Sequence, residues 1–484
     1  MNLSAIDLGL LLIYLLGMLG LALWLGRKTS SASEFMVGGR DLPWWVILAS
    51  IVATETSSVT FLSIPGFAFS RDFSWLQIAL GFLLGRFLVV SLLLPLYFRG
   101  SLFTSYEVLH RRFGGATQRV ASVIFIVTRS LADGLRLFLS AIVLQELAGI
   151  PFVWAIVISG LVTIAYSYVG GMRAVLWADF AQFLIYLAGA IVALFVVVGR
   201  LPEGWSQLWA MGEAAGKLRV LDLKLDWSQP FTLWAGLAGG VFITLGSHGV
   251  DQMMVQRYLS AKNLGDARKA LGTSGFVVLA QFALFLTIGL GLWCFYQLHP
   301  PAVPFDRPDR VFARFIVEEM PVGLVGLLLG ALFAAALTSS LNSCATAAVK
   351  DLWQPLAGQP LSEQRELRLT RVLTAVFGLV QIGVGIGGQW LQSSVINSVL
   401  GIAGFTTGIV LGVFFLGLFA TKVGQKAALA GLVVGLAGMT AIYFGTQLAW
   451  PWYPLAGSSI TFVAGRAASW IWSRESSEAV EHGP

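Results

Sequence analysis

The stretch "VATETSSVTFLSIPG", residues 52–66, decides how this chain folds. It lies within the long apolar segment "LPWWVILASIVATETSSVTFLSIPGFAF", residues 42–69. The same stretch carries an acid, Glu55, and a run of hydroxyl side chains: Thr54, Thr56, Ser57, Ser58 and Thr60. An acid and so many oxygens within apolar sequence indicate a site for a polar ligand or ion.

The composition predicts a helical membrane protein. Of the 484 residues, 57% are hydrophobic and 12% are charged, and the mean hydropathy is +0.79. A soluble domain has about 25% charged residues. Apolar runs of about 20 residues, long enough to cross a hydrocarbon core, recur throughout the chain. A β-barrel would instead show alternating segments of about ten residues, and the sequence has none. We therefore expect an all-α polytopic fold, because lipid offers the backbone no hydrogen-bond partners.

The apolar runs predict about 13 transmembrane helices. Their expected ranges are 6–26, 44–69, 74–98, 118–148, 151–169, 176–199, 231–253, 271–297, 321–348, 369–389, 393–420, 425–446 and 452–472. Basic residues concentrate in the loops after the first, third, seventh and ninth of these runs, which predicts that those loops are cytoplasmic. The N-terminus is then outside and the C-terminus cytoplasmic, in a plasma membrane (bacterial inner membrane). The net charge of +6 is an orientation signal on this interpretation and does not indicate nucleic-acid binding.

Few residues suit catalysis or a transition metal. Two cysteines support no disulfide framework, and four scattered histidines have no metal-ligand spacing. No catalytic acid–base set is visible, so we expect no enzyme activity.

Two of the expected helices are rich in small and hydroxyl residues: "ILASIVATETSSVTFLSIPG", residues 47–66, and "LLLGALFAAALTSSLNSCATA", residues 327–347. Small residues let membrane helices pack closely, and hydroxyls hydrogen-bond across them. Either run alone is compatible with simple packing. Two such runs together with the acid Glu55 favour a binding site.

Intramembrane charges are costly and are therefore functional candidates. Glu55 needs a cation, a proton or a water-filled cavity, and a hard cation such as Na⁺ prefers oxygen ligands. Backbone carbonyls become available only where the helix unwinds, which the β-branched residues and "SIPG" favour. The alternative is a neutral Glu55 bonded to a neighbouring helix.

Other polar side chains have both a functional and a structural interpretation. Asp179 and Gln182 share a helical face, although a dipole-stabilised acid at a helix start explains Asp179 equally well. Either Arg129 or Arg136, which also share a face, could pair with Glu55 or with an anionic substrate, and Arg86 is a further intramembrane arginine. Snorkelling to the interface is the alternative for these arginines. His248 and Asp251 fit a structural polar cluster as well as a site.

The chain resembles the sodium:solute symporter family over nearly its whole length. Six motifs carry the resemblance: "SASEFMVGGRDLPWW" (31–45), "TSSVTFLSIPG" (56–66), "LPLYFRGSLFTSYEVLHRRFG" (94–114), "YVGGMRAVLWADFAQ" (168–182), "DQMMVQRYLSAKN" (251–263) and "FAAALTSSLNS" (333–343). Each is weak alone, but together they occur in the expected order.

The resemblance implies a leucine-transporter-like fold with inverted five-helix repeats and a midplane site. Residues 1–43 would form an extra N-terminal helix and a cytoplasmic loop. The repeats would occupy 44–199 and 231–420, separated by an extracytoplasmic loop, 200–230. Residues 421–484 would form two peripheral helices and a cytoplasmic tail.

The resemblance also assigns residues to sites. The implied sodium ligands are Ala53, Thr56, Ala335, Thr338 and Ser339. A second ion site would use Asp179 and Ser340, although the chain is shorter here than many family members by nearly one turn. The expected substrate-binding residues, which should face the substrate cavity, are Glu55, Ser57, Thr60, Gln77 and Arg136. For Glu55 an ion-ligand role is favoured over a proton carrier, because no neighbouring histidine suggests a relay.

The function expected on these grounds is sodium-coupled symport of a small polar solute by alternating access. The sequence leaves open a sugar, an amino acid or a carboxylate. The alternatives are a proton-coupled carrier that uses Glu55 and, more remotely, a transporter-like membrane sensor. The expected partners are the solute, Na⁺ as coupling ion and the lipid bilayer, with no nucleic acid and no evident obligate protein partner.

Overall fold

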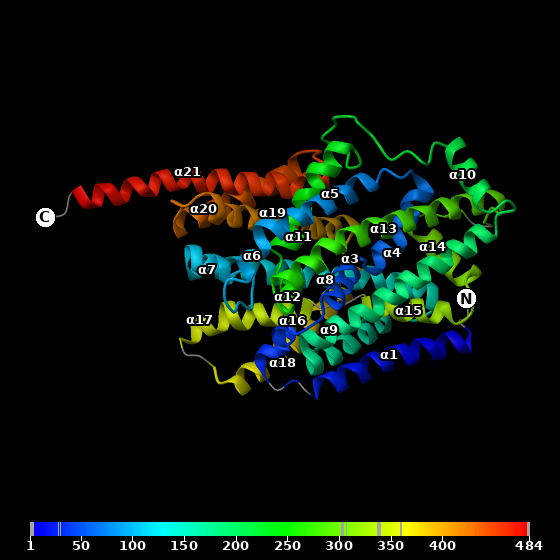
Figure 1. The fold of residues 1–484 in the computed structure, drawn as a ribbon, viewed down its shortest axis with the longest axis horizontal. Helices are drawn as coiled ribbons and strands as arrows, with labels where there is room; N and C mark the ends of the chain where they lie inside the picture. The colour runs from blue at the N-terminus through cyan, green and yellow to red at the C-terminus, as the bar shows by residue number, and fades with distance from the viewer. Residues whose placement is uncertain are drawn as a thin grey trace.

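A computed structural model describes residues 4–27, 29, 31–301, 304–305, 307–335, 340–358 and 361–481. The described parts form helices joined by loops (Figure 1). Six helices are long and apolar enough to cross a membrane within these ranges, or seven if one bent pair counts as a single span. The other expected transmembrane ranges hold helices that are shorter, interrupted or, as in α8, less apolar.

The helices before residue 200 follow the expected ranges with two informative differences. Their bounds are α1 Ala5–Gly26, α2 Ala32–Val37, η1 Gly38–Arg40, α3 Trp44–Glu55, α4 Ser58–Ser70, α5 Leu76–Leu88, η2 Val89–Leu93, α6 Leu94–Tyr97, α7 Glu107–Phe113, α8 Gly115–Ala148 and α9 Phe152–Gly199. The expected range 44–69 is broken between α3 and α4, with a bend of 57°. The expected ranges 151–169 and 176–199 are joined in α9.

The chain turns inside α9 at Gly171, whose φ of 57° and ψ of −153° are not helical. A Cβ built on Gly171 would lie 2.6 Å from the carbonyl oxygen of Phe35. Only glycine combines this positive φ with so close a backbone approach. Gly171 therefore lets α2 pack against the middle of α9.

The later helices again occupy the expected ranges. They are α10 Trp205–Ala214, η3 Ala235–Gly239, α11 Gly240–Gly249, α12 Gln252–Leu259, α13 Leu264–Leu298, α14 Asp309–Glu319, α15 Leu324–Ala335, α16 Ser340–Ala347, η4 Ala348–Trp353, α17 Gln354–Ala357, α18 Glu363–Gly387, η5 Gly388–Trp390, α19 Ser393–Phe419, α20 Gln425–Gly445, η6 Trp450–Trp452 and α21 Tyr453–Glu481. Residues 336–339, between α15 and α16, lie outside the described ranges.

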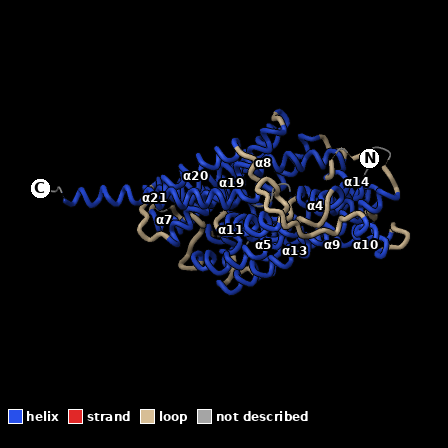
Figure 2. The backbone as a smooth tube through the Cα atoms, turned by 90° about the horizontal axis from the view of Figure 1, so that it is seen from above, coloured by secondary structure: helices blue, strands red, loops and turns tan. Residues whose placement is uncertain are grey.

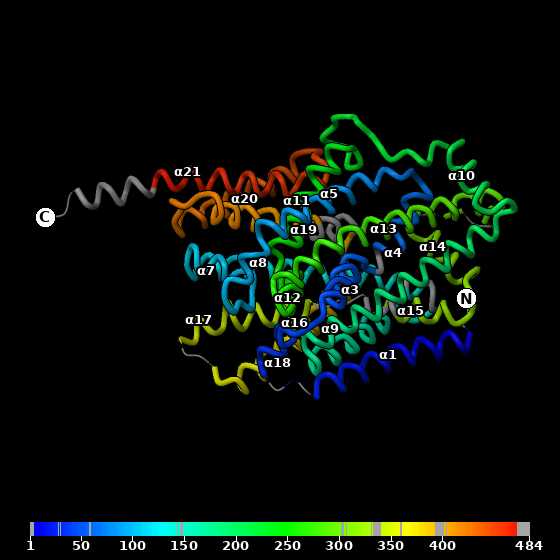
Figure 3. Tube along the Cα trace, in the orientation of Figure 1, coloured from blue at the N-terminus to red at the C-terminus, as the bar shows by residue number. Residues whose placement is uncertain are grey.

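The broken pair α3 and α4 is enclosed by other helices. α3 packs against α9 and α13, and α4 packs against α13 and α14. α1 lies along one edge of the bundle beside α9 and α15, whereas α19, α20 and α21 form a group at the opposite edge (Figures 1 and 3). Figure 2 shows α19, α20 and α21 together from another side. The helix break is thus interior, where freed backbone groups need partners from protein or ligand.

Two side chains fasten helix ends, one at the start of α15 and one at the end of α4. Asp7 of α1 accepts hydrogen bonds from the backbone N–H of Gly323 (2.7 Å) and Gly326 (2.9 Å), at the start of α15. Lys217 donates to the carbonyls of Ala68 (3.2 Å), Phe69 (2.9 Å) and Arg71 (2.8 Å), at the end of α4. Burial lowers the pKa of this ammonium from its ordinary value. These contacts supply partners that helix ends otherwise lack.

A buried carboxylate, Asp351, joins η4 to α8 and to the segment before α7, just beyond the expected span 321–348. Its Oδ1 accepts hydrogen bonds from Thr104 Oγ1 (2.7 Å) and Gln118 Nε2 (2.6 Å), and its Oδ2 accepts one from Ser122. Burial raises the pKa of Asp351 to about 7, because these neutral donors compensate the desolvation of the charge only in part.

We expect Asp351→Asn to flatten the pH dependence of stability between about pH 4 and pH 7. In this window the folded protein holds the proton and the unfolded chain releases it, so the stability of the wild type falls as pH rises. The check is the apparent melting temperature of the purified protein in detergent at several pH values. Asp226→Asn, at an exposed carboxylate, is the control. If the melting temperatures of the wild type and of Asp351→Asn fall in parallel as pH rises, Asp351 is not the group responsible for the pH dependence.

Candidate functional site

The helix break exposes backbone oxygens at its centre. α3 ends at Glu55, and Thr56 follows with φ −86° and ψ 69°, so the carbonyls of the last turn, including that of Ala53, lose their helical donors. Ser57 begins the next helix by accepting a hydrogen bond from the N–H of Thr60 at 3.2 Å. Buried carbonyl oxygens at a helix break suit a hard cation such as Na⁺.

Thr56 is buried beside this break. Its hydroxyl lies 2.9 Å from the carbonyl oxygen of Val52 and 3.0 Å from Gln281 Oε1 of α13. The hydroxyl oxygen retains acceptor capacity after donating its single proton. Thr56 and Ala53 are therefore close together at the end of α3, as their expected shared role requires. Ala335 ends α15, whereas Thr338 and Ser339 lie outside the described residues.

Glu55 has a cation and a histidine as partners. Its carboxylate contacts Arg86 of α5 and His248 of α11. The Arg86 side chain is 1% exposed, and it also donates to Ser274 Oγ (3.2 Å) and to the carbonyl of Phe82 (3.2 Å). The expectation of no histidine beside Glu55 is therefore wrong. His248 comes from a helix far along the chain, so the local sequence around Glu55 could not reveal it.

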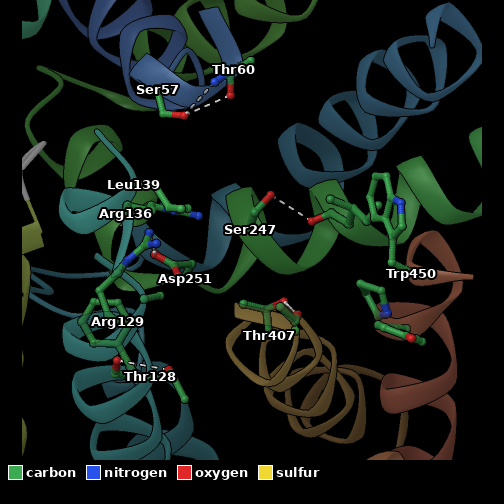
Figure 4. A pocket seen from close by; sticks show the side chains of 17 residues that line it. Ser57, Thr60, Thr128, Arg129, Arg136, Leu139, Ser247, Asp251, Thr407 and Trp450 are labelled. Carbon is green, nitrogen blue, oxygen red and sulfur yellow. Dashed lines mark hydrogen bonds and ion pairs between the residues drawn. The ribbon is translucent and has the colours of Figure 1, made fainter. Parts of the chain in front are cut away.

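A cavity of about 540 Å³ lies beside the break, between α8, α11, α19 and the start of α21 (Figure 4). Ser57 and Thr60 border it from α4. Polar and aromatic side chains share the rest of the wall, namely Thr128, Arg129, Arg136, Ser247, Asp251, Thr407, Trp450 and Tyr453. This volume falls within the range of about 300–1,000 Å³ typical of sites for small organic ligands.

One side of the cavity is formed by paired charges. Arg136 Nη1 lies 3.2 Å from Asp133 Oδ1, yet 47% of the Arg136 side chain remains exposed. Arg129 is more buried and lies 3.5 Å from Asp251 Oδ1 and 3.7 Å from Asp133 Oδ1. A guanidinium has five N–H donors, so Arg136 can bind a carboxylate while it keeps its contact with Asp133.

The cavity is connected to Glu55 through two side chains of α11. Ser247 lines the cavity, and its Oγ lies 2.9 Å from His248 Nδ1. The other ring nitrogen, Nε2, contacts Glu55. The Glu55 carboxylate therefore contacts Arg86 and His248 directly. The hydrogen bond between His248 and Ser247 links it to the cavity wall.

Asp179, expected at a second ion site, is already paired with a cation. Arg257 Nη2 of α12 lies 3.1 Å from Asp179 Oδ2, and Ser50 Oγ donates to the same oxygen at 2.5 Å. Arg257 Nε also donates to Ser50 Oγ at 2.9 Å. Ser340, the other expected ligand, accepts a hydrogen bond from Gln381 Nε2 at 3.0 Å. Both candidate ligands thus have protein partners.

Gln77, expected to bind substrate, contacts a loop instead. Its Nε2 donates to the carbonyls of Ser74 (3.2 Å) and Phe231 (3.1 Å), and its Oε1 accepts from the N–H of Asp222 at 3.0 Å. These contacts hold the 200–230 loop against the start of α5. The structure therefore brings together Ser57, Thr60 and Arg136, with Gln77 elsewhere.

Sequence reasoning missed the contributions of Arg257 and of two aromatic residues, Trp450 and Tyr453. Arg257 lies in the motif "DQMMVQRYLSAKN", so an arginine within an apolar turn was the available signal. Trp450 and Tyr453 lie in the segment "AWPWYP", residues 449–454, at the start of the last expected transmembrane range, 452–472. Their position depends on how α21 packs on α19.

A model of the sodium:solute symporter family matches residues 35–435. A sodium/sialic acid symporter of Aliivibrio fischeri is 28% identical, with 93% of this chain and 90% of that protein covered. A sodium-coupled monocarboxylate transporter 2 of Bos taurus is 29% identical, with 85% of this chain and 67% of that protein covered.

A solved structure shares the fold of this chain over nearly its whole length. The substrate-bound, outward-open state of a Na⁺-coupled sialic acid symporter matches with a TM-score of 0.90 and 26% identity, and the match covers 97% of this chain and 98% of that chain. The all-helical, leucine-transporter-like membrane fold expected above is thus confirmed. The chain belongs to the sodium:solute symporter family, and it is a sodium-coupled membrane symporter of small solutes rather than an enzyme.

Proposed function

We propose that the transported solute is a small organic carboxylate that binds Arg136 in the cavity. The observation that carries this proposal is the guanidinium of Arg136, which is buried on one side by Asp133 and open to the cavity on the other. An Arg–carboxylate pair is a strong, directional contact in a site with little water. Two relatives are named for acids, sialic acid and monocarboxylates, which supports the same class.

Charge balance also favours an anion that travels with sodium. Arg129, Arg136, Asp133 and Asp251 form a set with two positive and two negative charges. A monoanion together with one Na⁺ leaves the total charge of the loaded site unchanged. Such a site avoids the cost of moving uncompensated charge through the low-dielectric interior.

For sodium, we propose a site at the break between α3 and α4. Its ligands are backbone oxygens of Ala53 and Thr56 and, from the segment that starts at the end of α15, oxygens of Ala335, Thr338 and Ser339. Sodium there joins the two helices and thereby orders Ser57 and Thr60 at the cavity edge. Binding of Na⁺ favours the outward-open form, and the solute then completes the closed form.

The proposed architecture is the one expected from the resemblance. About 13 helices cross the membrane, with inverted repeats in 44–199 and 231–420, and with an outside N-terminus and a cytoplasmic C-terminus. The two repeats rock about the cavity to expose it alternately to each side.

A second candidate is proton coupling through Glu55. The chain of contacts from Ser247 to His248 and on to Glu55 favours it, because histidine can pass a proton between its two ring nitrogens. The buried Arg86 opposes it, since Arg86 stabilises Glu55 as the carboxylate.

We expect Arg136→Gln to raise the half-saturating concentration of a carboxylate solute by about ten- to a hundredfold. The variant loses a charge-assisted contact of roughly 1.5–3 kcal/mol. The measurement is Na⁺-driven uptake into proteoliposomes from a panel of sialic acid, lactate, proline and glucose. Thr440→Ala, at an exposed hydroxyl of α20, is the control. Wild-type uptake of glucose alone would contradict the proposal.

We expect one Na⁺ per solute and therefore electroneutral uptake of a monoanion. The guanidinium of Arg257 already neutralises Asp179, which leaves the second ion site short of ligands. Asp179→Asn should change the Na⁺ requirement less than Thr338→Ala or Ser339→Ala does. The measurement is uptake with the membrane potential clamped at different values. A coupling ratio of two that falls to one in Asp179→Asn would overturn this expectation.

We expect Glu55→Gln to lower the melting temperature, because removing one partner of a buried ion pair costs about 3–5 kcal/mol. The double variant Glu55→Gln/Arg86→Met should recover stability, since it leaves no unpaired charge. The Na⁺ concentration for half-maximal uptake by this double variant then distinguishes a counter-ion role of Glu55 from an ion-ligand role. A value near wild type indicates a counter-ion role. A ten- to a hundredfold rise, or roughly 1.5–3 kcal/mol, would instead make Glu55 an ion ligand. Sodium-independent, pH-driven wild-type uptake would favour proton coupling.

A further inference from the structure

The cavity has a second, aromatic side. Trp450 and Tyr453, from η6 and the first turn of α21, line it together with Pro454. Figure 4 shows Trp450 across the cavity from Arg129 and Arg136, with Ser247 and Thr407 between them. The Trp450 side chain is 40% exposed. The cavity thus has an end formed by paired charges, where Arg136 lies, a central band of hydroxyls and an aromatic end.

The aromatic segment is held firmly in this position. The N–H of Ala449 donates to the carbonyl of Trp227 at 2.8 Å, and the Trp227 and Trp452 ring centroids are 4.5 Å apart. Pro454 packs directly on α19, where a Cβ added to Gly408 would lie 2.5 Å from the Pro454 Cα. Glycine is required for so close an approach. Trp450 is therefore a fixed part of the cavity wall rather than a loose surface side chain.

Ring contacts further restrict these side chains. The Trp450 and Trp75 centroids are 6.4 Å apart and tilted by 35°, and those of Tyr453 and Tyr443 are 5.7 Å apart at 65°. Aromatic pairs in these arrangements stabilise each other beyond simple burial. A preorganised aromatic wall binds a ring with little loss of conformational entropy.

We propose that Trp450, with Tyr453 beside it, selects carboxylates that carry a ring. The carboxylate lies at Arg136 and the ring packs on Trp450 at the opposite end of the cavity. This inference rests on the proposed function, because it assumes that Arg136 binds the carboxylate. It assigns solute selection to η6 and the start of α21, which lie outside the two repeats that are proposed to rock. A carboxylate without a ring contacts Arg136 alone and leaves the aromatic end of the cavity unused.

The test compares propionate with 3-phenylpropionate, which share a carboxylate and differ by a ring. We expect Trp450→Ala to raise the half-saturating concentration of 3-phenylpropionate about tenfold, equivalent to about 1.4 kcal/mol. Propionate should change less than about twofold, because it does not contact Trp450. Trp450→Phe, which keeps an aromatic ring, should retain most of the selectivity. Trp470→Ala, at an exposed position later in α21, is the matched control.

The outcomes separate this inference from the proposed function. An equal effect of Trp450→Ala on both acids, or no effect on either, would overturn the aromatic selection and leave carboxylate transport intact. If the wild type transports no carboxylate, the proposed function fails, and the neutral probe 3-phenylpropanamide still tests the wall. A melting-temperature rise with this probe in wild type and Trp450→Phe, lost in Trp450→Ala, supports the ring site. A rise of the same size in Trp450→Ala, or none in the wild type, overturns it.

Discussion

The structure depends on a helix that stops and restarts in the interior of a membrane protein. Between Glu55 and Ser58 the backbone leaves the helical path, and its carbonyls lose their normal donors. In hydrocarbon each unsatisfied backbone group costs several kcal/mol, so the break survives only where protein groups or ions replace those donors. The Thr56 hydroxyl, which donates to the carbonyl of Val52, and the Thr60 hydroxyl, which donates to that of Glu55, meet part of this demand. The oxygens that remain are those to which we assign the proposed sodium site.

A single short stretch, residues 248–257, connects the buried charges of the first half of the chain. His248 meets Glu55 of α3, Asp251 meets Arg129 of α8, and Arg257 meets Asp179 of α9. Buried ion pairs add little net stability, but breaking one is expensive, so they favour one arrangement of helices over others. The end of α11 and the following α12 therefore fix the register between elements on both sides of the 200–230 loop. Relative movement of the two halves must carry these pairs along or exchange their partners.

The sequence was sufficient to predict the helix break but not the partners of its charges. Hydroxyl and β-branched residues around Glu55 are local signals, so the break is readable from a few neighbouring residues. The contacts of Glu55 with Arg86 and His248 join three helices, and no local pattern encodes which intramembrane arginine approaches which acid. Gln77 illustrates the same limit, since its helical position suits a cavity but its partners come from a distant loop. Trp450 enters the cavity wall only because α21 packs on α19.

Lys217 gives the surface loop a mechanical role. Its ammonium holds three carbonyls at the end of α4, so a displacement of that helix end pulls on the loop that contains Lys217. The same loop carries α10, where Trp205 and Trp209 stand at the surface. Indole emission responds to changes in polarity around the ring. In a variant whose other tryptophans are replaced, the emission of Trp205 and Trp209 would therefore report displacement of α4.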